Sequence, residues 1–199
     1  MERTITQQQS SGRRTFIILA VIFMGPLLLA AVLFKYQLVP GGATNKGKLI
    51  DPPVALLGEE LTRLDTEGGM VDTDSLLRGK WTLAFVGSGD CDEICAKNLY
   101  HIQQIWIGTN REMTRVQRAW LVADEVGSKR IGKVSRENPG LMVFDATDST
   151  LVPRFPAVAD APIYLIDPQG YLMMSWQRDQ DPREMLKDLR KLLRHSKAG

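Results

Sequence analysis

The sequence predicts an α/β domain, a mixed sheet flanked by helices, carried by one N-terminal transmembrane helix. Three observations predict this: an uncharged apolar run near the N-terminus, short apolar runs that alternate with helical patterns from Trp81 onward, and a helix-start signal at Asp181-Pro182. About 150 residues follow the apolar run and its linker, enough for one domain with one core. The expected parts are a tail (1–15), a transmembrane helix (16–36), a flexible linker (37–48) and a folded domain (49–195).

The apolar run from Phe16 to Phe34 is long enough to cross a bilayer. Its 19 residues carry no charge, and at about 1.5 Å per residue they span a hydrocarbon core. No clean cleavage site of small residues follows the run, so we expect a retained anchor rather than a removed signal peptide. The expected partner of residues 16–36 is therefore membrane lipid.

The charges that flank the run indicate its orientation. Three arginines within the first 14 residues mark the N-terminal side as cytoplasmic. Three lysines between Lys35 and Lys48 oppose this assignment, but a long domain translocates largely regardless of its charge. We therefore expect a single-pass inner-membrane protein with a periplasmic C-terminal domain, or a domain in the mitochondrial intermembrane space of a eukaryote. Thiol pairs in such compartments can be oxidised.

The charge balance excludes nucleic acid as a partner. Taking Arg3, Arg13, Arg14 and Glu2 from the totals of 25 basic and 23 acidic residues leaves 22 of each over residues 16–199. A neutral domain has no electrostatic footprint for a phosphate backbone.

Three strands and two helices are expected in the first part of the domain. Continuous apolar runs predict buried strands at Trp81–Val86, Ala119–Ala123 and Leu141–Phe144. Apolar residues at helical spacing predict a helix from Cys95 to about Thr109. The polar segment Lys129–Glu137 predicts a short helix, because Asn-Pro-Gly follows it.

A hairpin and a helix are expected to close the domain. The runs 162–166 and 171–176 are separated by Asp167-Pro-Gln-Gly170, a strong turn signal. Asp181 is a good N-cap and Pro182 suits the first helical position. The resulting order of strands and helices predicts a sheet covered by helices.

The only two cysteines lie four residues apart, directly after the strand expected at Trp81–Val86. A helix N-terminus favours thiolate over thiol, and positions i and i+4 of a helix lie one turn apart. Cys91 and Cys95 can then form a disulfide or share a soft ion such as Cu(I). A bridge that closes so short a loop is a poor structural staple, so we favour reactive or metal-binding thiols.

Other candidate ligands are weaker. His101 is six residues past Cys95, about 240° around a helix, and should face away from the thiols. His195 is expected to be a solvated residue at the end of the last helix. Asp92 and Glu93 offer hard oxygen atoms, which suit Cu(I) poorly. They are more typical of favourable acids in a first helical turn.

The remaining conspicuous side chains are interpreted as packing or surface groups. The four tryptophans and the pair Met173-Met174 are expected in the core and on the sheet. The basic residues of the last helix are expected on its solvated face, with a weak contact to a lipid surface or an acidic partner as the alternative. These residues are Lys187, Arg190, Lys191 and Arg194.

The order of these features resembles the thioredoxin fold: a thiol pair beside the first helix, a β-α-β unit, a Pro-led hairpin and a closing helix. The spacing Cys-x-x-x-Cys, the approach Leu76–Trp81 and the segment Tyr164–Pro168 resemble the membrane-anchored Sco/SenC family. Members of that family assist assembly of the copper-A centre of cytochrome c oxidase. The resemblance implies copper as a ligand and oxidase subunit II as a partner.

Two departures from the Sco/SenC pattern affect the expected site. That family adds a histidine ligand shortly before the hairpin, where residues 157–162 contain none, and Asp92 replaces its usual proline after the first cysteine. Pro162 instead stands where thioredoxins and TlpA/ResA-like reductases place a cis-proline that guides a partner chain. The expected site residues are therefore Cys91, Cys95 and Pro162, and the isomer of the Ala161-Pro162 bond is left open.

Two function classes follow. In the first, the chain is a thiol-disulfide oxidoreductase in which Cys91 attacks a partner disulfide and Cys95 resolves the mixed disulfide. In the second, the two cysteines carry Cu(I) to the oxidase with an incomplete ligand set. An assembly scaffold with little chemistry of its own is a third alternative.

Overall fold

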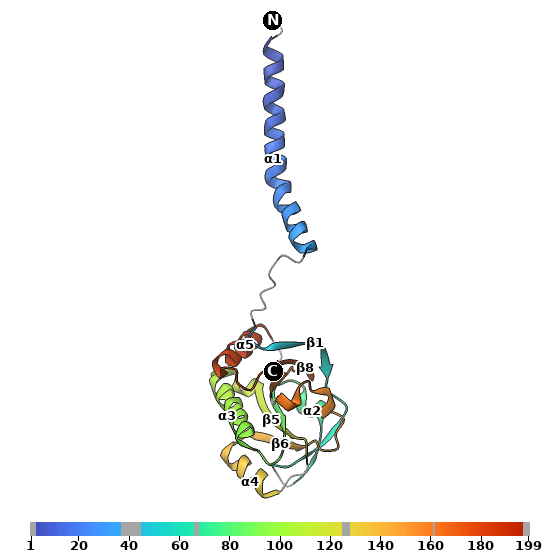
Figure 1. The fold of residues 1–199 in the computed structure, drawn as a ribbon, viewed down its shortest axis with the longest axis vertical. Helices are drawn as coiled ribbons and strands as arrows, with labels where there is room; N and C mark the ends of the chain where they lie inside the picture. Colours follow the sequence, from blue (N-terminus) through green and yellow to red (C-terminus); the bar gives the residue numbers. More distant parts are fainter. Residues whose placement is uncertain (1–2, 37–44, 66–67, 125–127, 161, 197–199) are drawn as a thin grey trace. The chain divides into compact units, whose positions relative to one another are not determined.

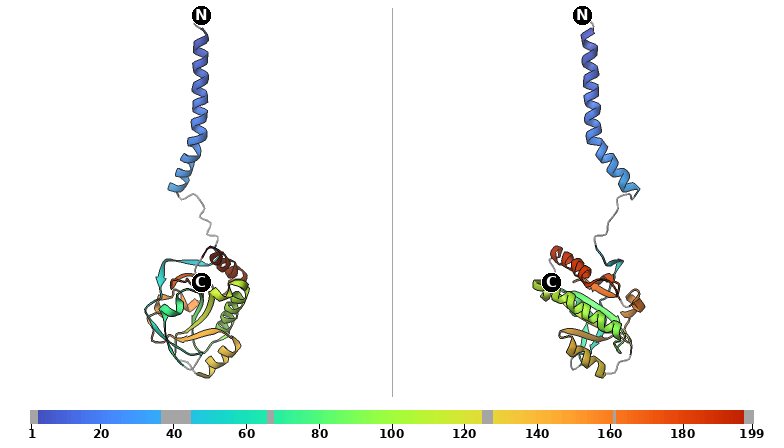
Figure 2. Two further views of the ribbon diagram at one scale, coloured as in Figure 1. Left: turned by 180° about the vertical axis from the view of Figure 1, so that it is seen from behind. Right: turned by 60° about the vertical axis from the view of Figure 1, so that its left-hand side comes forward.

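The computed structural model describes residues 3–36, 45–65, 68–124, 128–160 and 162–196. The chain divides into two compact units, Met1–Thr44 and Asn45–Gly199. Figures 1 and 2 show the helix of the first unit and the sheet and helices of the second.

The first unit consists of the helix α1, Arg3–Lys35. Its segment Gly12–Leu33 is long and apolar enough to cross a membrane, and none of it is buried against protein. This confirms the expected N-terminal apolar helix, which starts earlier than residue 16. Figure 1 shows a bend in α1, and Pro26 lies inside the helix. A proline removes a backbone hydrogen bond and commonly kinks a helix.

The second unit is built on a mixed sheet with the strand order β1-β8-β7-β4-β5-β6-β2-β3. The pairs β4–β5 and β5–β6 are parallel. The other neighbouring pairs of this order are antiparallel. The described strands are β1 (Lys48–Ala55), β2 (Glu60–Arg63), β3 (Met70–Asp72), β4 (Trp81–Gly87), β5 (Val116–Val122), β6 (Leu141–Asp145), β7 (Ile163–Ile166) and β8 (Tyr171–Trp176). The predicted strands are confirmed, and β1, β2 and β3 are additions.

Helices cover the sheet on both faces. The described α-helices of this unit are α2 (Thr73–Leu77), α3 (Glu93–Gly108), α4 (Ser128–Glu137) and α5 (Pro182–His195). The helices α3, α4 and α5 contribute apolar residues to one core cluster, and α2 contributes Leu77 to the other. Figure 2 shows α3 and α5 side by side. The predicted α/β architecture, a central mixed sheet flanked by helices, is confirmed.

The central strand β4 is buried on both faces, as its continuous apolar run predicts. Leu83 and Phe85 join the core cluster beneath α3 and α5, whereas Ala84 and Val86 join the opposite cluster. Burial on both sides fixes the strand, so the loop that leaves its end at Gly87 starts from a rigid position.

The tryptophans and methionines that were expected in the core are buried or partly buried. Trp81, Trp120 and Trp176 are buried, and Trp106 is partly buried against the same cluster. Met174 is buried and its neighbour Met173 is partly buried, and both pack on the same core cluster.

Candidate functional site

The two cysteines are joined in a disulfide, with their Cα atoms 4.9 Å apart. They lie beyond the carboxyl end of β4, which pairs in parallel with β5 so that Gly87 is opposite Val122. The carboxyl ends of adjacent parallel strands meet at one edge of a sheet, where loops commonly form binding sites. The disulfide therefore occupies the edge at which this fold class places its chemistry.

The backbone at the disulfide differs from the predicted helical turn. Asp92 is extended (φ −65°, ψ −173°) and caps α3, since its carboxylate accepts a hydrogen bond from the Cys95 N–H at 2.9 Å. Helix α3 begins at Glu93, so Cys91 lies outside it. The i, i+4 helical spacing used to predict that the sulfurs meet is thus wrong for this pair, because Asp92 is the N-cap and the helix begins after Cys91. Asp92 is therefore the N-cap and not an acid of the first turn, whereas Glu93 does lie in the first turn as expected.

Cys91 has a left-handed backbone conformation, with φ +41°. Such a conformation is uncommon for a residue with a side chain, and strained backbone of this kind clusters at functional sites. The Cys91 N–H donates to the carbonyl of Ser88 at 3.3 Å, and the Asp90 N–H donates to the Ser88 hydroxyl at 3.2 Å. The loop thus folds back on itself and presents Cys91 just before the helix.

Both cysteines are largely buried, with 8% of Cys91 and 3% of Cys95 exposed. They adjoin different cavities. Cys95 lines a cavity of about 490 Å³ between the loops that follow β4, β5 and β8. Cys91 lines a cavity of about 320 Å³ between α3 and α4, together with Tyr100 and Lys133. The two cysteines therefore face different cavities, one on each side of the disulfide loop.

Charged groups surround the Cys95 cavity. Asp90, Asp92, Asp124 and Arg178 all line it. Asp124 follows β5 and accepts a hydrogen bond from the Gly89 N–H at 2.7 Å, which ties the cysteine loop to the neighbouring strand. Our sequence reasoning missed Asp124 and Arg178. The signal for Asp124 was available, because residues that follow adjacent parallel strands meet at one edge.

Pro162 is buried directly before β7. Ile163 pairs with Phe85 of β4, so the register places Pro162 near the end of β4 from which the cysteine loop departs. Val158 and Ala159, a few residues earlier, line the Cys95 cavity. The Ala161-Pro162 bond lies outside the described residues.

The two histidines lie apart from any three-donor cluster. Burial lowers the pKa of His101, the nearby charge of Lys97 lowers it further, and Asp181 at the start of α5 opposes both. The ring of His101 thus lies toward the start of α5. His195 is exposed at the end of α5.

The donor set was tested for copper. Over the described residues, no group of three or more His, Cys, Asp and Glu side chains could hold a metal ion. A site with two thiolates and a third ligand from His, Cys, Asp or Glu therefore does not fit this part of the chain. The reduced sulfurs of Cys91 and Cys95 alone are suited to Cu(I), which accepts two soft ligands.

Comparison with known proteins places this fold. A family model described as "Transmembrane-like, thioredoxin-like, C-terminal domain" matches residues 81–196, more than half of the chain. No curated protein matches the chain.

Solved structures match the fold at low sequence identity. Copper-bound ScoI of Bradyrhizobium japonicum is 18% identical at a TM-score of 0.53, over 69% of this chain and 99% of that one. Copper-bound yeast Sco1 is 15% identical at a TM-score of 0.60, and the match covers 74% of this chain and 96% of that one. MTB dsbF, in mixed oxidised and reduced forms, is 14% identical at a TM-score of 0.52, and the match covers 68% of this chain and 96% of that one. The chain belongs to the transmembrane-like, thioredoxin-like C-terminal domain family, and its fold is the Sco/SenC-like thioredoxin fold.

Proposed function

We propose that this chain is a membrane-anchored thiol-disulfide oxidoreductase of Sco/SenC type, which reduces the copper-site cysteines of cytochrome c oxidase subunit II in the periplasm. The observation that carries the proposal is the disulfide between Cys91 and Cys95 at the carboxyl edge of the parallel strands. The copper-bound Sco structures and the MTB dsbF structure share this fold and support the choice of chemistry.

The proposed reaction starts from the reduced pair. The Cys91 thiolate attacks one sulfur of the client disulfide, which forms a mixed disulfide and releases one client thiolate. The Cys95 thiolate then attacks the Cys91 sulfur and releases the second client thiolate. Two electrons have passed to the client, and the chain is left with the disulfide seen in the structure. A dithiol donor must reduce that disulfide before the next cycle.

The local structure supports different roles for the two sulfurs. Cys91 is the more exposed and precedes the helix. Cys95 is the more buried, and its backbone N–H is held by the Asp92 carboxylate. A resolving thiol needs a fixed position next to the mixed disulfide, and Cys95 has one. The attacking thiol needs access to a partner, which Cys91 has through the cavity between α3 and α4.

Trapping of the mixed disulfide tests the proposal. The reduced full chain in detergent is mixed with the soluble copper-A domain of oxidase subunit II, whose two cysteines are oxidised. Cys95→Ser should accumulate a covalent complex through Cys91, and Cys91→Ser should not. His101→Ala is the matched control on the same helix and should turn over like the parent chain. Equal trapping by both serine variants would contradict the assigned roles, and no client reduction by the parent chain would contradict the reaction.

Delivery of Cu(I) is the second candidate function. It is favoured by the two copper-bound Sco structures of the same fold and by the suitability of two thiolates for Cu(I). Competition with a chromophoric Cu(I) chelator should show one ion per reduced chain, bound more weakly than at a three-ligand site. Binding should be lost in either serine variant. A tight Cu(II) complex with strong sulfur-to-copper charge-transfer absorption would show that a fuller ligand set exists.

A further inference from the structure

The helix α5 presents a strongly basic face. Five of its cationic residues are exposed, whereas its acidic residues are withdrawn from solvent: Glu184 is half-buried and Asp188 is buried. The exposed cations are Arg183, Lys187, Arg190, Lys191 and Arg194. Because residues 16–199 carry equal numbers of acidic and basic residues, this face is a local concentration of charge and not a property of the whole domain.

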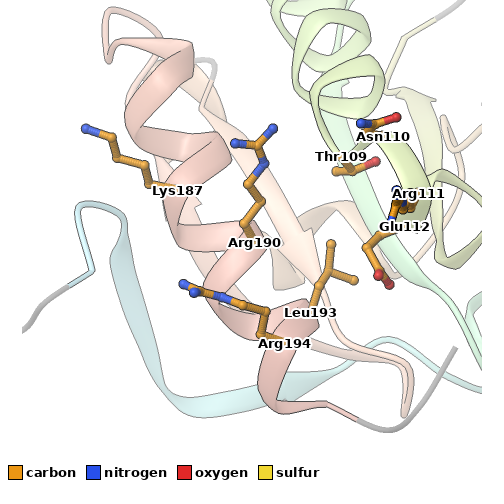
Figure 3. A pocket seen from close by; sticks show the side chains of 8 residues that line it. All are labelled: Thr109, Asn110, Arg111, Glu112, Lys187, Arg190, Leu193 and Arg194. Atoms are coloured by element: carbon orange, nitrogen blue, oxygen red, sulfur yellow. The ribbon is translucent and has the colours of Figure 1, made fainter.

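A groove extends this basic face. It measures about 540 Å³ and lies between α5 and the segment that follows α3 (Figure 3). Arg111 adds a further cation from that segment, and Thr109 and Asn110 add polar groups. The acid in the lining, Glu112, pairs with Arg115 at 2.6 Å. The groove thus keeps a cationic rim beside a region that is rich in hydrogen-bond donors.

The chain from the membrane anchor enters the domain at the same helix. The N–H groups of Lys46 and Gly47 each donate to the Asp188 carboxylate of α5 at 2.8 Å. From Tyr36, directly after α1, to Asn45 the chain can span at most about 32 Å, because an extended residue covers no more than about 3.6 Å. The length of the chain therefore sets an upper limit on the distance between Asn45 and the end of the membrane anchor. Lys46 and Lys48 are exposed at this entry point.

We propose that the basic face of α5 docks on the anionic phospholipid headgroups of the membrane that anchors the chain. A charged membrane surface attracts clustered Lys and Arg residues within about a Debye length, and guanidinium groups bind phosphates through paired hydrogen bonds. The short connection supplies the high local concentration that a free acidic protein would lack. Docking restrains the position of the disulfide domain above the bilayer.

Lysine footprinting of the full chain in lipid nanodiscs tests this docking. The discs contain phosphatidylcholine, either alone or with phosphatidylglycerol. Acylation of Lys187 and Lys191, measured by mass spectrometry, should slow by at least about threefold in the anionic discs. High salt should restore it, because ions screen the attraction. Lys133 on α4 is the internal control and should react equally in both discs. Equal rates at Lys187 and Lys191, or equal slowing at Lys133, would overturn the proposal; equal rates would leave an acidic protein as the partner of this face.

A charge-removal variant sharpens the test. Arg183→Gln with Arg194→Gln removes two exposed cations from α5 and should abolish most of the protection at Lys187. Lys80→Gln with Arg136→Gln removes the same charge from exposed positions elsewhere in the domain and should leave the protection intact. Matching unfolding temperatures verify that both variants fold. Full protection in the α5 variant would overturn the proposal. Client reduction in detergent is measured separately, so failure of docking is distinguishable from failure of the proposed redox function.

Discussion

Substitution of Asp188 provides a quantitative test of the hydrogen bonds that fix the start of the folded domain, at Lys46 and Gly47, to α5. Asp188 is 5% exposed, and one of its carboxylate oxygens accepts three hydrogen bonds. Two come from the backbone N–H groups of Lys46 and Gly47 at 2.8 Å, and one comes from the Trp176 indole N–H at 3.1 Å. The carboxylate therefore joins the entry of the chain, the strand β8 and the helix α5.

The expected cost follows from the donors that remain. Asp188→Ala leaves three donors without their acceptor, two of them in fully buried hydrogen bonds. A hydrogen bond to a charged group contributes about 1.5–3 kcal/mol, and bonds that share one oxygen are not additive. We expect a loss of about 3–5 kcal/mol in the free energy of unfolding. Asp188→Asn keeps an oxygen acceptor and should cost about 1–2 kcal/mol.

Urea unfolding of residues 45–199, which form a compact unit of their own, measures these losses. The fluorescence of the four tryptophans of this unit, Trp176 among them, follows the unfolding. Lys187→Ala, at an exposed neighbouring position, is the matched control and should change the free energy of unfolding by less than about 0.5 kcal/mol. A change of similar size in Asp188→Ala and in the control would refute the reasoning, because it would show that the three hydrogen bonds contribute nothing net.

Three further predictions concern a helix cap, a titrating group and a turn. Asp92→Ala should lower the free energy of unfolding by about 1 kcal/mol, and Asp92→Asn by about a few tenths of a kcal/mol. The Asp92→Asn variant should also speed alkylation of the reduced cysteines, because it removes a negative charge beside the thiols. His101→Gln should flatten the dependence of stability on pH. Since burial lowers the pKa of His101 below its ordinary 6.5, the unfolded chain binds the proton first, and parent stability falls as pH drops below about 7. Gly170→Ala should cost about 1–3 kcal/mol in urea unfolding, because φ is +87° and a Cβ would overlap Leu57.

The second half of the domain was predictable because its local signals agree with its packing. Continuous apolar runs gave the buried strands β4 to β7, and helical spacing gave α3. Asp181 does cap α5, since its carboxylate accepts from the Arg183 N–H at 2.8 Å, and Pro182 is the first helical residue. In each case one short segment carries both the propensity and the burial pattern.

The strands before β4 were not predictable, because their local sequence signals do not match their positions in the sheet. Strand β1 is mostly exposed and contains Pro52 and Pro53, which is typical of an edge strand rather than of a strand recognisable by its pattern. Strand β2 has four residues and pairs with β6, far along the chain. The pairings of β1 with β8 and of β2 with β6 join segments far apart in the sequence, so no local window contains those contacts.

The pair of cysteines in the candidate site was predictable, but the residues and geometry around it were not. The spacing of Cys91 and Cys95 correctly indicated that their sulfurs meet. It did not indicate that Asp92 would cap α3 and leave Cys91 outside the helix, because Asp at this position is equally suited to a first helical turn or to an N-cap. The partners of the loop, such as Asp124, depend on how neighbouring strands align.

This asymmetry has a consequence for the proposed redox cycle. Cys95 is part of α3 and is held by helix hydrogen bonds, whereas Cys91 has a left-handed backbone that a non-glycine residue adopts only when its surroundings enforce it. The disulfide is one of those restraints, so its reduction removes a restraint from the loop and leaves the helix unchanged. The loop also lines the Cys95 cavity through Ser88 and Asp90. A client that docks against this loop therefore meets a different surface in the oxidised and reduced states, and release of the client can follow directly from formation of the Cys91–Cys95 bond.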